Sequence, residues 1–499
     1  MLDKVKLFMK KLWDNPKFYW LFIALVFVIC RLGTWLYPFD SDHWIFYYLG
    51  NDWFHGGSLY VTAWDHKPPV IFLLNGLMSL FGNSLLTHRI IITIFAVVDI
   101  YLFYKLAKIF AQKLLPKRAE LFTKLSLLLY VFWRNLMQFT SSGNNNENFG
   151  LIFYLGMLLS YFSFREDRKW WKMLISGSCF AILFFMKGNF LLLAAPLGVI
   201  LFIDFYKKIS KFFIHGITFI FPLIILAAGL SLYFFSKGSL NDFVIASFSF
   251  SAKYSSSAWS GGLSDLKVFY LLVAFASPLI VFVPIFFAYI YRKHIVNIDF
   301  LFIFLSLAFG SVAFFAVGVP YLYYFLILMP VYILAATYLF LTKEDINKYI
   351  GFIFIIIFCF GMGINFLYSN YQIIKNQISN VATEAEEYRS IAQYIDGHSN
   401  PSDKVFVNDY GATFYRLSNR KSGSRFVSAS VLLLDYRGNY GFDLDKIFIS
   451  DMDKSQAKYV VTYKDKSTLY YQNKPVIRYF DSHYHLEKSF KKFEVLRRN

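Results

Sequence analysis

Two aspartates, Asp40 and Asp42, follow the first apolar run of the chain, in the sequence Pro-Phe-Asp-Ser-Asp-His-Trp. A carboxylate at the mouth of a cavity can act as a general base and remove a proton from a hydroxyl group. Asp42 can instead cap a helix, because it precedes an amphipathic stretch, 43–55, whose first backbone N–H groups need acceptors. The spacing alone leaves both interpretations open.

A second group of polar residues forms the sequence Asp65-His66-Lys67-Pro68-Pro69. The prolines stiffen the backbone and present Lys67 at the start of the next apolar segment. Its ammonium can pair with a lipid phosphate as a point charge, or extend to the headgroups as an anchor. His66 is a candidate metal ligand, although a lone histidine makes a metal site less often than not.

Three further charged residues stand at the ends of apolar runs. Arg89 lies at the start of one run, and Lys187 is the only charged residue between 174 and 203. Both are candidate phosphate contacts, with membrane anchoring as the alternative. Glu147 belongs to a polar cluster, 141–148, and is either a first-turn acid of a helix or a carboxylate facing a cavity.

The composition indicates the kind of protein that must position these groups. The 499 residues are 57% hydrophobic, with a mean hydropathy of +0.46. Only 16% are charged, against roughly 25% in soluble domains. These values exclude a disordered chain, a collagen-like chain and a single soluble enzyme. The three cysteines, Cys30, Cys179 and Cys359, lie inside apolar runs and predict no disulfide framework.

Eleven apolar runs are long enough to predict membrane crossings, since a spanning helix needs about 20 residues. A further segment, 69–82, is shorter and predicts an interfacial or re-entrant helix. The predicted crossings are 17–38, 88–110, 121–139, 148–164, 170–187, 190–207, 212–236, 266–291, 298–318, 320–341 and 349–369.

The net charge of +18 is explained by topology and does not indicate nucleic-acid binding. The basic residues cluster between apolar runs, and they all fall on one side of the membrane if 69–82 does not cross. The positive-inside rule places that side in the cytoplasm, together with the N-terminus. The C-terminus and the stretches 39–87, 141–148 and 237–265 are then external. The basic clusters are 4–11, 105–118, 165–172, 207–211, 292–294 and 343–348.

The composition changes near residue 370, which predicts a transmembrane domain, 1–369, and an extracytoplasmic α/β domain, 370–499. Apolar residues at helical spacing predict an amphipathic helix over 380–397. Short β-like runs follow it. These runs are Lys404–Val407, Arg425–Ser428, Tyr459–Tyr463 and Val476–Phe480.

The first external loop contains the segments Asp42–Gly50, Gly57–Tyr60, Trp64–Pro69 and Leu80–Gly82, followed by Arg89. This combination resembles the first external loop of the polytopic GT-C glycosyltransferases, in the branch of the protein O-mannosyltransferases and the lipid A aminoarabinose transferase. Looser similarities are the residues Asn146–Phe149, Lys187, Tyr415–Arg420 and Ser424–Phe426.

The resemblance implies a GT-C-like polytopic α-helical membrane protein with about 11 crossings, interfacial helices and a small external α/β domain. It implies inverting transfer of a sugar from a polyprenyl phosphate on the external face. By this resemblance Asp42 takes the role of the family's catalytic acid, or Asp40 if the register shifts. Lys67 takes that of the donor-phosphate contact, with Arg89 and Lys187 as candidate further contacts. Tyr60, Asp65, His66, Glu147, Arg420 and Arg425 are then expected to line the substrate cavity.

Metal dependence stays open, because some relatives place a zinc-linked glutamate where this chain has His66. The sequence identifies no cofactor, and the resemblance leaves open both a metal-independent reaction and one assisted by a divalent metal. The expected partners are a polyprenyl-phosphate-linked sugar, an envelope glycan, lipid or protein acceptor, and the bilayer of the plasma membrane. The composition is compatible with an AT-rich bacterial genome, because Phe, Ile, Lys, Asn and Tyr are abundant. In a bacterium the expected lipid carrier is undecaprenyl phosphate.

Two other classes of function are compatible with a polytopic chain. A flippase or transporter predicts charges buried within spans and inverted repeats. Neither is clear, since ionisable residues such as Arg31 and Asp99 are few. A non-catalytic scaffold of an envelope-assembly complex is the other alternative.

Overall fold

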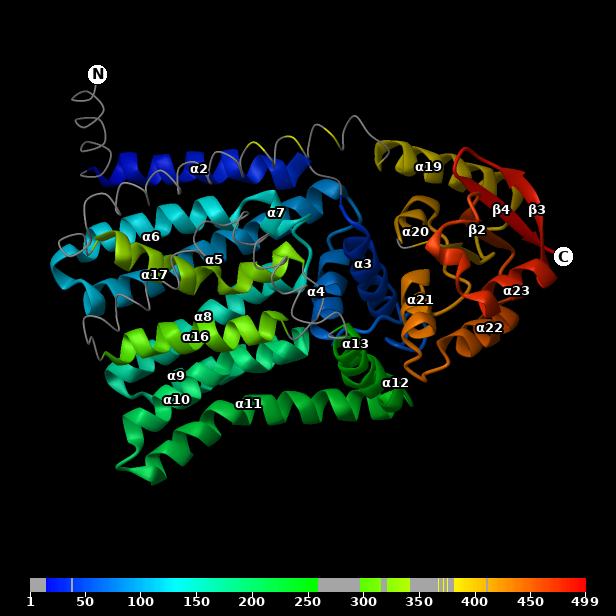
Figure 1. The fold of residues 1–499 in the computed structure, drawn as a ribbon. Coiled ribbons are helices and arrows are strands. Elements are labelled where there is room, and N and C mark those ends of the chain that lie inside the picture. The colour runs from blue at the N-terminus through cyan, green and yellow to red at the C-terminus, as the bar shows by residue number, and fades with distance from the viewer. Residues whose placement is uncertain are drawn as a thin grey trace, which may run out of the picture.

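The long helices of the computed structural model lie roughly side by side, and the C-terminal region lies at one end of this bundle (Figure 1). The predicted crossings 266–291 and 349–369 fall almost wholly outside the described residues, as does the predicted domain boundary at 369/370. The crossing number and the boundary therefore stay predictions. The structure describes residues 15–36, 39–258, 297–315, 321–341, 367, 371, 375, 381–409 and 412–499.

The bundle helices form where the apolar runs predict them. Five helices among the described residues are long and apolar enough to cross a membrane, which makes the chain a multi-pass membrane protein. Leu232 on α11 is 69% exposed, as expected of a side chain facing lipid. The bundle consists of α2 (Pro16–Leu36), α5 (Leu85–Leu114), η1 (Pro116–Arg118), α6 (Ala119–Arg134), α7 (Met137–Thr140), α8 (Asn146–Asp167), α9 (Trp170–Met186), η2 (Gly188–Ala194), α10 (Ala195–Phe205), α11 (Ile209–Ser236), α16 (Ile298–Phe315), η6 (Leu322–Leu328) and α17 (Met329–Leu341).

Short helices cover the end of the bundle that faces the C-terminal region (Figure 1). The predicted interfacial segment forms α4 over ten residues, about 15 Å, which is too short for a bilayer core of about 30 Å. Helix α4 packs closely on α3, because a Cβ atom on Gly50 would lie 2.4 Å from the backbone nitrogen of Gly76. The short elements are α3 (Ser41–Phe54), α4 (Val70–Ser79), α12 (Leu240–Val244), the π-helical turn η3 (Ile245–Phe250) and α13 (Ser251–Ala258).

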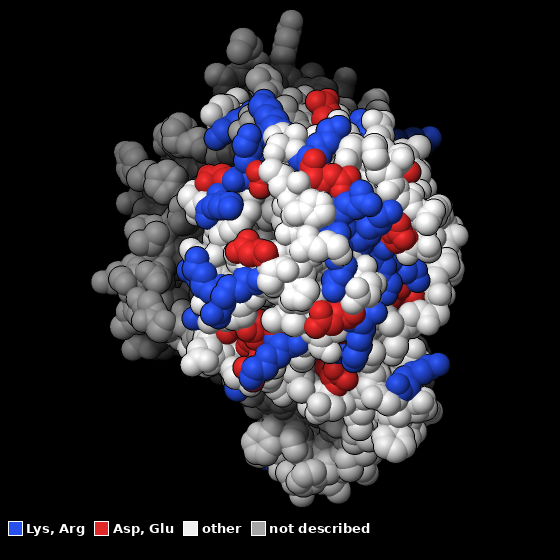
Figure 2. Space-filling view, turned by 90° about the vertical axis from the view of Figure 1, so that its right-hand side faces the viewer, with Lys and Arg blue, Asp and Glu red and all other residues white. Residues whose placement is uncertain are grey.

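The C-terminal region contains a four-stranded sheet with strand order β1-β2-β4-β3. Strand β1 pairs in parallel with β2, and β4 pairs antiparallel with both β2 and β3. The outer face of this region carries charges of both signs (Figure 2). Its elements are α19 (Val381–His398), β1 (Val405–Asn408), α20 (Thr413–Ser418), α21 (Ala429–Gly438), α22 (Leu444–Ser455), β2 (Tyr459–Tyr463), η8 (Leu469–Tyr471), α23 (Lys474–His483), β3 (Tyr484–Ser489) and β4 (Phe493–Arg498).

Two of the four predicted strands are confirmed and two are wrong. Strands β1 and β2 lie within a residue of their predicted positions. The run 476–480 lies in helix α23, because Asn473 caps its first turn and a proline follows at the helix start. The run 425–428 is irregular, since the backbone N–H of Arg425 donates to the Asp451 carboxylate (3.1 Å) instead of to a neighbouring strand.

Candidate active site

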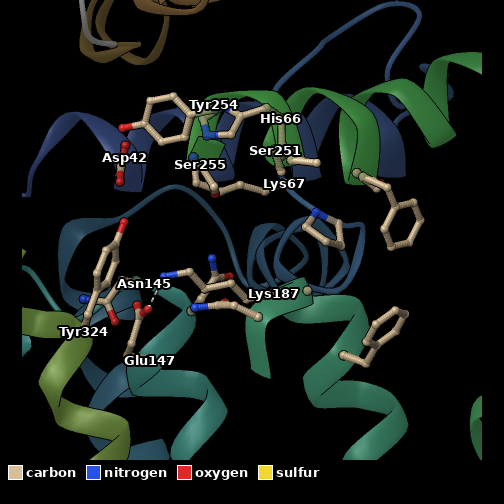
Figure 3. Close-up of a pocket in the computed structure, with 18 of the residues that line it drawn as sticks. Asp42, His66, Lys67, Asn145, Glu147, Lys187, Ser251, Tyr254, Ser255 and Tyr324 are labelled. Atoms are coloured by element: carbon tan, nitrogen blue, oxygen red, sulfur yellow. Dashed lines mark hydrogen bonds and ion pairs between the residues drawn. The ribbon is translucent and has the colours of Figure 1, made fainter. Parts of the chain in front are cut away.

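A cavity of about 410 Å³ lies where α3, the loop before α4, the start of α8, the end of α9, α13 and η6 meet. This volume is within the range of small-molecule sites. Figure 3 shows Asp42 and Tyr254 on one side of the cavity and Glu147, Tyr324 and Lys187 on the other. Residues separated by more than 280 positions in the sequence therefore converge on one site.

Asp40 and Asp42 have different environments. Asp40 caps α3 by accepting the backbone N–H of His43 (3.0 Å), and it also accepts the hydroxyl groups of Ser141 (2.7 Å) and Ser142 (2.8 Å). Asp42 lies in the first turn of α3 and lines the cavity, and it makes no hydrogen bond or ion pair within the described part of the chain. The capping interpretation of Asp42 is therefore wrong, because Asp40 has that role.

Burial raises the pKa of Asp42 from its ordinary value near 3.8 to about 6. The positive charge of Lys67 opposes this rise, whereas the charges of Asp40, Asp65 and Glu147 add to it. A carboxylate that titrates near pH 6 is a stronger base than an ordinary aspartate and is still mostly ionised at neutral pH.

Lys67 lines the cavity from a loop held by Tyr60 and Asp65. The Tyr60 hydroxyl donates to the carbonyl oxygen of Lys67 (2.7 Å), from a backbone with φ of +71°, which a tyrosine rarely adopts. The Lys67 ammonium is 3.1 Å from a carboxylate oxygen of Asp65. Burial would lower the pKa of Lys67, but the charges of Asp65 and Asp42 outweigh it and raise this pKa, so the ammonium stays charged.

Lys187 and Glu147 form the other ion pair of the cavity. Their nitrogen and oxygen atoms are 2.6 Å apart, and the Lys187 ammonium lies 3.4 Å from the ring centre of Tyr324. Burial lowers the pKa of Lys187, and the charge of Glu147 opposes this effect. Each of the two cations in the cavity is thus held by one carboxylate.

Six predicted site residues do not line this cavity: Asp40, Tyr60 and Asp65, which were described above, and three arginines. Arg89 donates to the carbonyl oxygen of Thr34 and stacks on Phe39. Arg420 pairs with Asp396 (2.9 Å), inside the C-terminal region. Arg425 pairs with Asp451 (2.9 Å).

Arg425 and its neighbours attach the C-terminal region to the segment that precedes α4. Its carbonyl oxygen accepts the backbone N–H of Trp64 (2.8 Å). The backbone N–H of Ser422 donates to the Tyr48 hydroxyl (2.9 Å), and Lys253 on α13 donates to the carbonyl of Tyr440. Residues expected at the substrate thus hold the loop that carries Lys67.

His66 lines the cavity, but the described residues around it do not make a metal site. Its Nδ1 atom is 3.5 Å from Asp65, and burial lowers its pKa to about 4. Over the described ranges, no group of three or more His, Cys, Asp or Glu side chains could hold a metal ion. The candidate chemistry therefore includes no step through a metal.

The cavity also contains tyrosines and amides that the sequence reasoning missed. Tyr323 and Tyr324 come from η6, Tyr254 from α13, and Asn145 from the turn before α8. The sequence Tyr-Leu-Tyr-Tyr, at the predicted external end of the run 320–341, is a signal that could have pointed to the η6 tyrosines as cavity residues.

Comparisons with solved structures identify the fold. The chain superposes on ArnT from Cupriavidus metallidurans bound to undecaprenyl phosphate with a TM-score of 0.59 and 11% identity, covering 97% of this chain and 98% of ArnT. For ArnT in the apo state the TM-score is 0.55 at 12% identity, covering 96% and 97%. The chain has the GT-C fold. It also matches the oligosaccharyltransferase AglB from Archaeoglobus fulgidus, in complex with an inhibitory peptide and a dolichol-phosphate, with a TM-score of 0.50 and 13% identity over 96% of this chain and 74% of AglB.

Two family models match parts of this chain. Residues 65–231 match "Dolichyl-phosphate-mannose-protein mannosyltransferase", a region that includes Lys67, Glu147 and Lys187. Residues 385–498 match "Putative competence-induced protein Ccs4 C-terminal domain". No curated protein matches the chain significantly. The predicted resemblance to GT-C glycosyltransferases is confirmed, and the fold class with it.

Proposed function

We propose that this protein transfers a sugar from a polyprenyl-phosphate donor to a hydroxyl group of a cell-envelope acceptor, with inversion at the anomeric carbon. The observation that carries the proposal is the cavity itself. It combines Asp42, a carboxylate whose side chain makes no hydrogen bond to any described residue, with two cations, Lys67 and Lys187. The similarity to the mannosyltransferase family model and to ArnT bound to undecaprenyl phosphate supports a lipid-phosphate donor.

The two cations are suited to hold the donor phosphate. A phosphate entering the cavity competes with Asp65 for Lys67 and with Glu147 for Lys187, and its oxygens accept charge-assisted hydrogen bonds from both ammonium groups. Polyprenyl phosphate is already a good leaving group. The protein therefore has to orient the donor and to neutralise the charge that develops on the phosphate.

Asp42 is suited to be the general base. As the acceptor oxygen attacks the anomeric carbon, its proton passes to the Asp42 carboxylate. The bond from the anomeric carbon to the phosphate oxygen breaks, and its electron pair leaves with the phosphate. The raised pKa of about 6 makes Asp42 a suitable acceptor of this proton at neutral pH.

The distribution of basic residues supports an external position for the cavity. Helix α8 begins at the cavity with Glu147 and reaches Arg165 at its opposite end. Lys113 at the end of α5 and Lys207 between α10 and α11 also lie at helix ends away from the cavity. The positive-inside rule assigns that end to the cytoplasm, and hence the cavity and the C-terminal region to the outside of the plasma membrane.

The test is Asp42→Asn in membranes that contain labelled polyprenyl-phosphate sugars from the source organism. Label should move from the lipid-extractable fraction to the acceptor fraction with wild-type protein. Asp42→Asn should reduce the rate at least 100-fold, in the range lost when a general base is removed. Asp481→Asn makes the same change at an exposed site and serves as the control. Undiminished transfer by Asp42→Asn, at a normal protein level, would refute the assignment of the base.

A further inference from the structure

A second hollow lies on the face of α3 opposite to Asp42. Its volume is about 590 Å³, and it is bounded by α3, the turn between α4 and α5, and α20. On α3, positions 44, 47, 48, 51 and 52 line it at helical spacing, with His55 just after the helix, whereas 42 and 46 line the first cavity. Asp52 is the α3 carboxylate among these residues, and its side chain accepts the hydroxyl of Thr62 (2.5 Å). Helix α3 therefore separates the two, and we call the second one the α3–α20 cleft.

Aromatic rings form the floor of the α3–α20 cleft. Trp44, Tyr47 and Tyr415 line it and are buried, and Tyr48 is half-buried. Polar groups surround these rings, among them the exposed amides of Asn83 and Asn419. A concave site of apolar rings with a few polar groups at its edge is typical of ligand sites.

Arg416 is a cation of this cleft that forms no ion pair with any residue the structure describes. Its guanidinium carbon lies 4.7 Å from the ring centre of Trp44, and its Nε atom is buried without a hydrogen-bond partner. No carboxylate in the described ranges pairs with it, whereas the neighbouring Arg420 pairs with Asp396. Burial lowers the pKa of Arg416, and an anion in the cleft would relieve this unfavourable burial of charge.

An apolar rim connects the cleft to the membrane surface. Gly82 and Asn83 line the cleft in the turn between the short helix α4 and the spanning helix α5. The side chains on both sides of them are exposed: Phe81 by 72% and Leu86 by 59%. Large apolar side chains exposed where a spanning helix begins are in the place to contact lipid chains.

We propose that the α3–α20 cleft binds the anionic headgroup of a membrane lipid from the same leaflet, with Arg416 as its anion contact. The aromatic floor packs against the headgroup, and the rim at Phe81 and Leu86 contacts the acyl chains. The site goes beyond the proposed transfer reaction and does not depend on it, because Asp42 faces the other side of α3. A lipid bound there would bridge the membrane helices and the C-terminal region.

The experiment measures lipid retention by the full chain. Protein in nanodiscs of phosphatidylcholine with increasing phosphatidylglycerol is released and analysed by native mass spectrometry. Wild-type protein should retain one phosphatidylglycerol molecule. The amount of phosphatidylglycerol needed for half-saturation should be about tenfold or more higher for Arg416→Gln, because this variant loses a charge-assisted hydrogen bond. Arg478→Gln removes an equally positive, exposed side chain from α23 and should retain the lipid as wild type does.

A second variant guards against a folding defect in Arg416→Gln. Asn419→Asp adds a carboxylate at an exposed position of the cleft, whose backbone φ of +52° aspartate tolerates, and should also weaken retention. Equal retention by wild type, Arg416→Gln and Asn419→Asp would overturn the proposal. So would loss of the lipid in Lys67→Met, which would assign it to the first cavity, or displacement by glycerol 3-phosphate, which would assign the cleft to a soluble anion.

Discussion

The charge of Lys67 should control the pH dependence of sugar transfer through Asp42. In the proposed mechanism transfer requires the ionised form of Asp42, so kcat/KM of the wild type should fall as pH decreases through about 6, the pKa of this group. Lys67 lowers this pKa, and an opposite charge within about 4–6 Å typically changes a pKa by roughly 1–3 units.

Replacing Lys67 with glutamine should therefore move the acidic limb of the pH profile to higher pH by at least about 1 pH unit. This shift corresponds to about 1.4 kcal/mol in the free energy of ionisation of Asp42. The uncompensated charge of Asp65 acts in the same direction. At pH 7 the ionised fraction of Asp42 falls from roughly nine-tenths to about one-half. Any larger loss of activity at that pH then reports weaker donor binding, because Lys67 also contacts the phosphate in the proposed mechanism.

The assay is transfer at subsaturating donor between pH 5 and pH 9, for wild type, Lys67→Gln and Lys67→Arg. The arginine variant keeps the positive charge and should keep the limb near pH 6, even if its rate is low. The reasoning fails if the limb of Lys67→Gln stays in place or moves to lower pH. It also fails if the wild-type limb lies near pH 4, the range of an ordinary aspartate.

Three further predictions concern the carboxylates around the cavity. Asp40→Asn should keep transfer within about threefold, because asparagine is an equally good helix cap, whereas Asp40→Ala should lower the thermal midpoint through a loss of about 1 kcal/mol. Asp42→Asn should raise the free energy of unfolding at pH 7.5 but not at pH 4. Because folding raises the pKa of Asp42 to about 6, ionisation of this group destabilises the folded wild type progressively between pH 4 and pH 6, by up to about 3 kcal/mol. Its thermal midpoint at the two pH values tests this, and an equal shift at both would contradict it. Lys187→Met should destabilise the protein by about 3–5 kcal/mol because it leaves Glu147 buried without a partner, and adding Glu147→Gln should restore most of the thermal midpoint.

The sequence was informative where one local pattern determines structure. Apolar length located the spanning helices, and helical spacing located α19. The group from Asp65 to Pro69 pointed to Lys67, which does line the cavity. The sequence left the base and cap interpretations of Asp42 open and did not consider Asp40 as the cap of α3. The serines that hold Asp40 come from residues 141 and 142, about a hundred positions away.

The remaining cavity residues could not be predicted because packing between distant parts of the chain brings them together. The polar cluster 141–148 was predicted only to lie on the external side of the membrane, and the sequence did not show that Ser142 to Asn148 are buried. The Asn144 amide contacts His43 (2.9 Å) and Asn75 (2.7 Å), and such pairs leave no periodic signal in the sequence. The tyrosines of η6 were missed for the same reason. The β3–β4 hairpin was missed because its exposed residues, such as Lys488, do not alternate with apolar ones as a half-buried strand requires.

The pairing of each cation in the cavity with its own carboxylate has a consequence for selectivity among anions. Asp65 and Glu147 occupy the ammonium groups whenever the donor is absent, so they act as internal competitors of any phosphate. A small ion such as inorganic phosphate has to displace both with no other contact to offset the exchange. A lipid-linked phosphate brings the burial of its hydrocarbon chain as well. Two carboxylates that take no part in bond breaking would thereby weaken the binding of phosphate dissolved around the cell. Binding of a phosphate anchored in the membrane would be affected less, because its hydrocarbon chain adds a favourable contribution.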